Sequence, residues 1–168
     1  MSKLPAVNDE VLNRLISENG DSILRMCYLY LKDYYLAEDA MQETFLSVYR
    51  NYNKFEHRST EKTWIIRIAI NQCKSIMRKK YFQREREQLS VDILDSNETT
   101  FLIEDTSVSD EVLKLPIKER EVILAYYYQE LSVKETAEVL GIKEAAVMQR
   151  LKRGRERLKS ILKGRIIL

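Results

Sequence analysis

Two stretches of sequence, AEDAMQETF at residues 37–45 and WIIRIAIN at residues 64–71, indicate how this chain folds. In both, apolar residues recur at the three- and four-residue spacing of a helix that buries one face. The opposite face of the first helix carries Asp39, Gln42 and Glu43, one helical turn apart. The opposite face of the second carries a regular polar row: Arg67, Asn71, Lys74 and Arg78. The two helices are therefore expected to form one functional unit.

The composition predicts an all-α protein. The chain has 168 residues, of which 45% are hydrophobic and 32% are charged, but only four glycines and two prolines. This composition favours helices, and no alternation of apolar and polar residues predicts a strand. The length permits one ordinary domain or two very small ones.

Four helices are expected in the first half of the chain. Asn8 or Asp9 is a suitable N-cap for the first, and Asp21 opens the second. The expected bounds are about 9–18, 21–32, 36–52 and 61–81. Cys27 and Cys73 lie within apolar helical patterns, so both are expected to be buried thiols.

Neither catalysis nor metal binding is expected. His57 is the only histidine, which leaves little material for acid–base or nucleophilic catalysis. No Cys has a partner at metal-ligand spacing, and no glycine-rich loop could hold a phosphate. The sequence therefore predicts a protein that is not an enzyme and has no cofactor or metal site.

The sequence also predicts a cytoplasmic protein. No run of about 20 apolar residues indicates a membrane span, and the N-terminus lacks the apolar core of a signal peptide. No direct membrane insertion is therefore expected.

Charge is segregated along the chain. Residues 81–110 contain eight acids and two bases, together with Ser, Asn and Thr, which is typical of a linker. Residues 143–168 contain nine bases and two acids. A basic terminal helix is the electrostatic signature of a nucleic-acid-binding surface, whereas a merely solvated face usually mixes both signs.

The second half of the chain contains the signals of a helix-turn-helix. Pro116 opens one helix, and Ser132 with Glu135 forms a capping box that starts the next. Gly141 is a C-cap for that short helix, and Ile142 leads into a longer basic helix. In a helix-turn-helix the last helix enters the major groove of DNA. Generic packing of three helices would produce the same pattern.

The last helix has an apolar stripe that is expected to face inward: Val147, Leu151, Gly154, Leu158 and Ile161. Met148, Gln149, Lys152 and Arg153 then lie on or near the exposed face. Gln can pair with adenine and Lys or Arg with guanine, so this face is suited to base recognition.

Both halves of the chain resemble an RNA polymerase sigma factor of the extracytoplasmic-function (ECF) type, a member of the sigma-70 superfamily that keeps only regions two and four. In the first half the resemblance is carried by Ala37-Glu38-Asp39, Gln42-Glu43-Thr44-Phe45, Trp64, Arg67-Ile68-Ala69, Asn71 and Arg78. In the second half it is carried by Leu115-Pro116, Arg120-Glu121-Val122, Ser132, Glu135, Ala137, Leu140-Gly141, Val147, Arg150-Leu151 and Arg155.

The resemblance implies an organisation in three parts. These are sigma region two at residues 1–86, an acidic flexible linker at 87–110 and sigma region four at 111–168. In the family the linker is threaded through the polymerase; its composition supports a simple tether equally well. The implied function is that of an alternative sigma factor, which binds core polymerase and directs promoter-specific initiation in a stress or envelope response.

The resemblance also implies a docking face for core polymerase. In the family, the row formed here by Asp39, Gln42 and Glu43 binds the Arg-rich clamp helices of the largest polymerase subunit. Carboxylates and an amide at one-turn spacing suit such charge-assisted hydrogen bonds. For Glu38 and Asp39, an internal ion pair with Arg67 or Arg78 is an alternative. An anti-sigma factor is a further implied partner.

The upstream promoter element would be bound as duplex DNA by the last helix. The implied contact residues are Arg120, Ser132, Met148, Gln149, Arg150, Lys152 and Arg153, of which Arg120 and Ser132 suit phosphates. The family commonly has Thr-Val-Lys-Ser-Arg-Leu where this chain has Ala146-Val147-Met148-Gln149-Arg150-Leu151. Met148 and Gln149 are therefore expected to alter the preferred bases.

The downstream promoter element would be bound as melted DNA by the loop at about 53–62 and the following helix. Asn71 is the expected reader of an extruded base, and Phe55 is expected either to stack on a base or to be buried. Lys74, Arg78 and Lys79 would bind the backbone.

Two other functions fit part of the sequence. A stand-alone helix-turn-helix regulator would explain residues 111–168, but it leaves the row at Asp39, Gln42 and Glu43 without a task. A sigma-like adaptor would bind polymerase or an anti-sigma factor without starting transcription.

Overall fold

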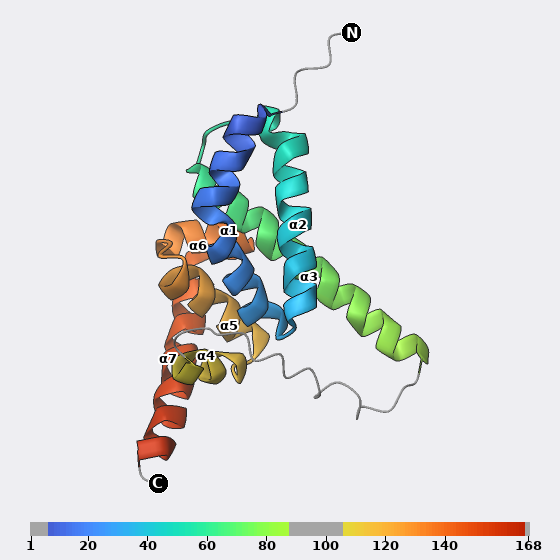
Figure 1. Cartoon of the computed structure of the whole chain (residues 1–168). Helices are drawn as coiled ribbons and strands as arrows, with labels where there is room; N and C mark the ends of the chain where they lie inside the picture. Colours follow the sequence, from blue (N-terminus) through green and yellow to red (C-terminus); the bar gives the residue numbers. More distant parts are fainter. Residues whose placement is uncertain (1–6, 88–105, 167–168) are drawn as a thin grey trace. The chain divides into compact units, whose positions relative to one another are not determined.

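The computed structural model describes residues 7–87 and 106–166 and divides into two compact units, Met1–Thr99 and Thr100–Leu168. The first unit contains α1 (Asp9–Leu31), α2 (Tyr34–Asn51), the short 3-10 helix η1 (Tyr52–Lys54) and α3 (Glu61–Glu87) (Figure 1). The second contains α4 (Thr106–Leu113), α5 (Ile117–Ile123), the π-helical turn η3 (Leu124–Tyr128), α6 (Val133–Leu140) and α7 (Glu144–Ile166). No strand occurs in the described ranges, so the predicted all-α class is confirmed.

In the first unit, each of α1, α2 and α3 packs against the other two (Figure 1). The side chains that meet there are almost completely buried and include Leu15, Ile23, Met26, Val48, Ile65, Ile66 and Ile70. The turn between α1 and α2 is defined by Lys32, which has a left-handed φ of 61° and donates its N–H to the Tyr28 carbonyl. Asp33 then caps α2 by accepting from the Leu36 N–H at 3.1 Å.

Helix α1 is continuous, whereas the sequence predicted two helices separated near residues 18–21. Gly20 is buried within α1. A glycine in a helix interior costs about 1 kcal/mol relative to alanine. Leu15 and Ile23, on either side of it, are both buried, and their burial outweighs that cost because tertiary packing supplies most of the stability of a helix.

Helix α3 continues to Glu87, beyond the predicted end at Tyr81. Helix α4 was not predicted at all, and it makes residues 106–110 of the expected linker helical. The residues at its end explain why it forms, because Glu111, Val112 and Leu115 are buried. Residues 88–105 of the expected linker lie outside the described residues, and the predicted domain limits stay a prediction.

In the second unit, α7 packs against α4, α5 and α6. The Ser132 side chain accepts from the Glu135 N–H at 3.1 Å, as the capping pattern predicts. Gly141 ends α6 with a left-handed φ of 66°, and the Ile142 N–H donates to the Ala137 carbonyl. Gly154 is needed for close packing, because a Cβ there would lie 3.1 Å from the Ile123 side chain.

The cysteines are buried and unpaired as disulfides, as predicted. A hydrogen bond with the Cys27 thiol, together with burial, raises the pKa of Cys73 far above the usual range of a thiol. Among the described residues, no helix is long and apolar enough to span a membrane, and no group of three or more His, Cys, Asp or Glu residues could hold a metal ion.

Candidate nucleic-acid and partner interfaces

The outer face of α2 carries the predicted polymerase-binding row. Asp39, Gln42 and Glu43 are all exposed, and none of the three makes a hydrogen bond or ion pair with another described residue. Their hydrogen-bonding groups are therefore available to a partner. Glu38, in contrast, accepts a hydrogen bond from the Tyr34 hydroxyl at 3.2 Å, and among the described residues neither Glu38 nor Asp39 forms the alternative ion pair with Arg67 or Arg78.

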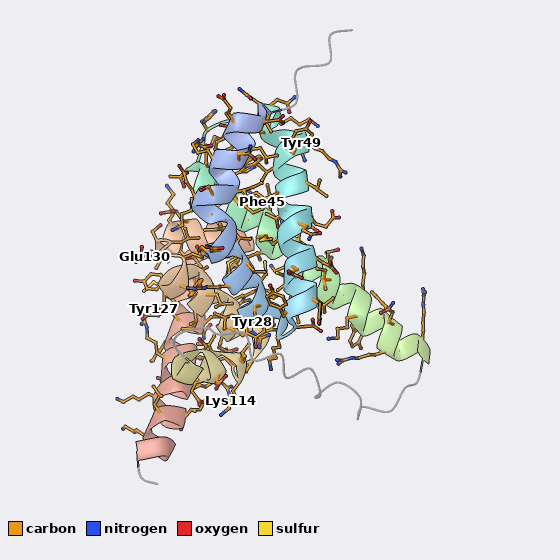
Figure 2. All side chains as sticks on the ribbon, viewed as in Figure 1. Tyr28, Phe45, Tyr49, Lys114, Tyr127 and Glu130 are labelled. Carbon is orange, nitrogen blue, oxygen red and sulfur yellow. The ribbon has the colours of Figure 1, made fainter. Side chains whose placement is uncertain are left out.

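Exposed apolar side chains extend this face of α2, which the sequence pattern did not predict. Tyr35 is 61% exposed, Leu46 44% and Tyr49 37%, and the position of Tyr49 on the outside of α2 is visible in Figure 2. Their spacing places them in line with Asp39 and Gln42 along the helix. Exposed apolar side chains that gather on one face of a helix beside polar residues mark a protein interface more often than a solvated helix face.

The connection between α2 and α3 is organised by a ring cluster, formed by Tyr52, Phe55, His57 and Trp64. The Phe55 ring stacks on Trp64 with centroids 4.8 Å apart and planes inclined by 25°. The ring centroids of His57 and Phe55 are 4.4 Å apart, and those of Tyr52 and Trp64 are 6.1 Å apart. Phe55 is half-buried, so its ring has internal partners in Trp64 and His57 while part of it remains accessible; stacking on a base stays a prediction.

Glu61 anchors both ends of this connection to α1. Arg14, on α1, donates to the two carboxylate oxygens of Glu61 at 3.2 and 3.0 Å. The Tyr52 hydroxyl donates to the same carboxylate at 3.1 Å. Burial and this bond raise the pKa of Tyr52 above its usual value, so its hydroxyl stays protonated as a donor. Residues 53–60 are thus held between two anchored ends.

The outer face of α3 carries the predicted row of polar and basic residues. Asn71, Arg78 and Lys79 are exposed, and Lys74 is half-buried. Because they share one helix with Trp64, their positions relative to the ring cluster are set by helix geometry. A melted strand that contacts the cluster can continue along these side chains.

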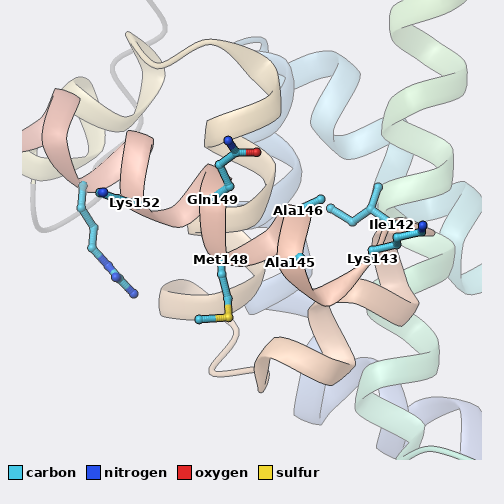
Figure 3. Close-up of a pocket in the computed structure, with 8 residues that line it drawn as sticks. Ile142, Lys143, Ala145, Ala146, Met148, Gln149 and Lys152 are labelled. Carbon is cyan, nitrogen blue, oxygen red and sulfur yellow. The ribbon is translucent and has the colours of Figure 1, made fainter.

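The outer face of α7 forms a shallow groove with the turn before it. The groove is lined by Ile142, Lys143, Ala145, Ala146, Met148, Gln149, Lys152 and Arg155. Figure 3 shows Met148, Gln149 and Lys152 projecting from α7, and Met148 is 62% exposed. Arg153 is exposed as well. The predicted base-contacting positions therefore lie on the accessible side of α7, and Val147 and Leu151 are buried on the other.

Two arginines of the predicted upstream contacts are used within the second unit. Arg120 is only 4% exposed, and its guanidinium donates to the backbone carbonyls of Leu113 and Leu115. A buried guanidinium with these partners is unavailable to a phosphate, which corrects the expected role of Arg120. Arg150 is half-buried and pairs with buried Glu121 at 3.2 Å, so it orients α7 rather than extending from it. Ser132 is exposed and remains accessible.

Most of the tyrosines are at least partly exposed. Of the ten, only Tyr30 is fully buried. Tyr127 is 51% exposed (Figure 2), and its hydroxyl accepts a hydrogen bond from Arg155. The same guanidinium carbon lies 6.0 Å from the centroid of the Tyr126 ring. These rings therefore hold a basic side chain at the edge of the α7 groove.

Comparison with known proteins assigns both units to one family. The family model described as Sigma-70 region 2 matches residues 15–82, and that described as Sigma-70, region 4 matches residues 106–158. The chain is 34% identical over 157 residues to the ECF RNA polymerase sigma factor SigW of Bacillus subtilis (strain 168), a match that covers 85% of this chain and 84% of SigW. The chain belongs to the ECF RNA polymerase sigma factors.

Further relatives agree with this assignment. The ECF sigma factor SigM of Bacillus subtilis (strain 168) is 29% identical over 148 residues, covering 84% of this chain and 88% of SigM. The fold is shared with the sigma factor RpoE in its complex with the anti-sigma factor NepR from Bartonella quintana. That match has a TM-score of 0.76 and 22% identity, and it covers 92% of this chain and 98% of RpoE. CnrH in complex with the cytosolic domain of CnrY matches with a TM-score of 0.69 and 21% identity over 94% of this chain and 91% of CnrH.

The protein is therefore an alternative sigma factor that directs transcription initiation. Sigma factors are non-catalytic subunits that bind core polymerase and promoter DNA. In this ECF sigma factor, the α2 face, the ring cluster and α3 belong to region two, and the α7 groove belongs to region four.

Proposed function

We propose that this ECF sigma factor binds the clamp helices of core polymerase through Asp39, Gln42 and Glu43. One observation carries the proposal: all three side chains are exposed at one-turn spacing and have no partner among the described residues. Two carboxylates and an amide in that state complement an Arg-rich helical surface, and binding breaks no internal hydrogen bond of theirs within the described residues.

The α7 groove then contacts the duplex upstream element. Gln149 is suited to adenine and Lys152 to guanine, and each good contact discriminates against a wrong base by about 1–3 kcal/mol. Met148 offers an apolar contact, such as one with a thymine methyl group. Arg153 and Ser132 bind phosphates, which set register without selecting sequence. The altered pair Met148 and Gln149 gives this sigma factor its own upstream preference.

The ring cluster and the outer face of α3 bind the melted downstream element. Asn71 contacts an extruded base, and the accessible part of the Phe55 ring supports it by stacking. Lys74, Arg78 and Lys79 bind the backbone of the melted strand, a contribution that weakens as salt concentration rises.

The protein acts in the cytoplasm, where the polymerase works, in a stress or envelope response. It has no catalytic activity of its own. An anti-sigma factor is its inhibitor, a partner suggested by the RpoE relative that was solved with NepR. Such an inhibitor would cover the α2 face and the α7 groove, because those surfaces bind the polymerase and the promoter.

Run-off transcription on fragmented genomic DNA, with bacterial core polymerase, tests the proposal. The wild type is expected to give discrete starts, which an Asp39→Ala/Gln42→Ala variant weakens together with its affinity for core. The matched control is Asn13→Ala/Ser17→Ala, which removes two exposed polar side chains one turn apart on α1 and should behave as wild type.

Each other outcome has its own meaning. Stable core binding without starts would indicate the adaptor. Specific duplex binding without core binding would indicate the stand-alone regulator. Starts that survive the double substitution would reject the proposed docking face.

A further inference from the structure

Two exposed aromatic rings stand near the end of α3. Tyr81 is 60% exposed and Phe82 is 57% exposed, and their centroids lie 6.0 Å apart in an edge-to-face arrangement. In Figure 1 the last turns of α3 extend beyond α1 and α2, which leaves these rings without a core to pack on. Adjacent exposed aromatic side chains of this kind mark binding sites more often than solvated surface.

The rings continue the polar row of α3. Arg67, Asn71, Lys74 and Arg78 follow one another at spacings of four, three and four residues, which keeps them on one face of the helix. Tyr81 and Phe82 come three and four residues after Arg78 and therefore lie on the same face. Phe82 is about 16 Å along the helix axis from Asn71, so the rings extend the surface beyond its predicted end.

The charge around the rings selects the class of ligand. Residues 74–86 contain six basic side chains and a single acid, Glu85. Its carboxylate, one turn after Tyr81 on the helix, raises the pKa of the Tyr81 hydroxyl above its usual value. A basic helix with interleaved aromatic rings is the arrangement that binds single-stranded nucleic acid. It also repels an Arg-rich protein surface of the kind that α2 suits.

We propose that Tyr81 and Phe82 form a stacking site for unpaired bases of the promoter, beyond the base held at Asn71. The site rests on the proposed function, in which α3 binds the melted strand. The rings offer faces to the bases, and Arg78, Arg84 and Arg86 neutralise the phosphates. Because every base has a π-face, the site tolerates any sequence and stabilises the open state of the DNA rather than selecting it.

The test separates stacking from apolar contact. Tyr81→Leu/Phe82→Leu keeps an apolar surface and a good helix former but removes both rings. Tyr81→Phe/Phe82→Tyr keeps both rings and moves the hydroxyl group from position 81 to position 82. The measurement is the affinity of the full-length chain, alone and with core polymerase, for a single-stranded oligonucleotide of mixed sequence and for its duplex.

The leucine variant is expected to bind the single strand at least about fivefold more weakly, as for the removal of one base stack. Its duplex binding and core binding should equal those of the wild type, and the ring-exchange variant should bind normally. The slope of log affinity against log salt should not change in the leucine variant. In Arg84→Gln/Arg86→Gln it should become shallower by about 0.7 for each phosphate that the variant no longer neutralises.

Wild-type single-strand affinity in the leucine variant would overturn the site. So would a loss of core binding, which would assign the rings to a protein interface, and so would a wild-type chain that binds no single strand with or without core. A failure of the proposed sigma function shows separately, as an absence of starts from the wild type in run-off transcription.

Discussion

The ring cluster and the α7 groove, the two surfaces that we propose bind DNA, differ in how their side chains are packed. On α7, Met148, Gln149 and Lys152 project from a helix whose packing is complete without DNA. In the ring cluster, Phe55 is already stacked on Trp64, so a base can gain only the part of that ring that remains accessible. A preformed helix suits the major groove of duplex DNA. In the proposed binding of a melted strand, in contrast, a base would meet rings that already have partners within the protein.

The two surfaces are also anchored differently. The helices around the α7 groove are held by two arginines of the second unit. Arg120 donates to two backbone carbonyls, and Arg150 pairs with Glu121. The ring cluster depends on one carboxylate, Glu61, which joins α1, η1 and α3. The basic residues of region four therefore fall into two groups: some stabilise the fold, and others are exposed to solvent.

This division of the arginines predicts a large change in stability. Arg120→Ala should lower the free energy of unfolding of the second unit by about 3 kcal/mol, because one part-buried and one buried carbonyl lose their donor and a cavity forms. Chemical denaturation followed by circular dichroism measures it. Arg153→Ala should leave stability unchanged while lowering the salt dependence of DNA binding. A stable Arg120→Ala protein with weaker DNA binding would restore Arg120 to the phosphate contacts.

A smaller effect is expected at the anchor of the ring cluster. Glu61→Ala should lower the stability of the first unit by about 1–2 kcal/mol, a value reduced by the partial exposure of the pair with Arg14. Initiation should fall further than stability explains, since residues 53–60 lose both anchored ends. Glu61→Gln keeps an acceptor for the Tyr52 hydroxyl, so its stability and its initiation activity should lie between those of the wild type and Glu61→Ala. Initiation by Glu61→Ala equal to wild type would remove Glu61 from the DNA-binding machinery.

The thiols allow the two units to be compared by pH. Both cysteines lie in the first unit, and the pKa of Cys73 is raised in the folded state. The unfolded chain therefore releases this proton first, above about pH 8.5, and stability should fall with rising pH by about 1.4 kcal/mol per pH unit. Below that pH the contribution is fully present.

The free energy of unfolding of the wild type should be compared with that of Cys73→Ala between about pH 7.5 and 9.5, a range that brackets the pKa of an ordinary thiol. Alanine does not titrate, so the difference between the two curves isolates the contribution of Cys73. The wild-type curve should be the steeper of the two. Equal slopes would show that Cys73 keeps an ordinary pKa in the folded protein. The second unit, which contains no cysteine, should show no thiol-dependent loss.

Two glycine substitutions should have small effects of opposite sign in the two units. Gly20→Ala should raise the stability of the first unit by about 0.5–1 kcal/mol, because an alanine suits a helix interior and its Cβ would meet Ile16 at an ordinary 3.6 Å. Gly154→Ala should destabilise the second by about 1 kcal/mol, since its Cβ would lie 3.1 Å from Ile123. Thermal unfolding of both variants measures these changes in stability. If both substitutions raised stability, or both lowered it, the packing described for one of the two glycines would be contradicted.

Local patterns predicted much of the fold. The caps at Ser132 and Gly141, the buried stripe at Val147 and Leu151, and the exposed row on α2 all follow from helical periodicity and from backbone groups within a few residues. The predictions that failed involve competition between local and distant forces. Gly20 suggested a break, but the packing of α1 kept the helix intact. Helix α4 was missed because its acidic, hydroxyl-rich sequence resembles a linker until its contact with α7 is known.

Consecutive residues alone were enough to predict an all-α ECF sigma factor with one polar face on α2 and one basic face on α7, because periodicity and family motifs are local properties of the chain. Which charges remain available became clear only from the packing of the helices. Arg14 finds Glu61 across 47 positions of sequence, and Arg120 finds backbone carbonyls in the interior. A residue's type shows that it can form such bonds, but the tertiary arrangement determines whether a partner within the protein has already taken them.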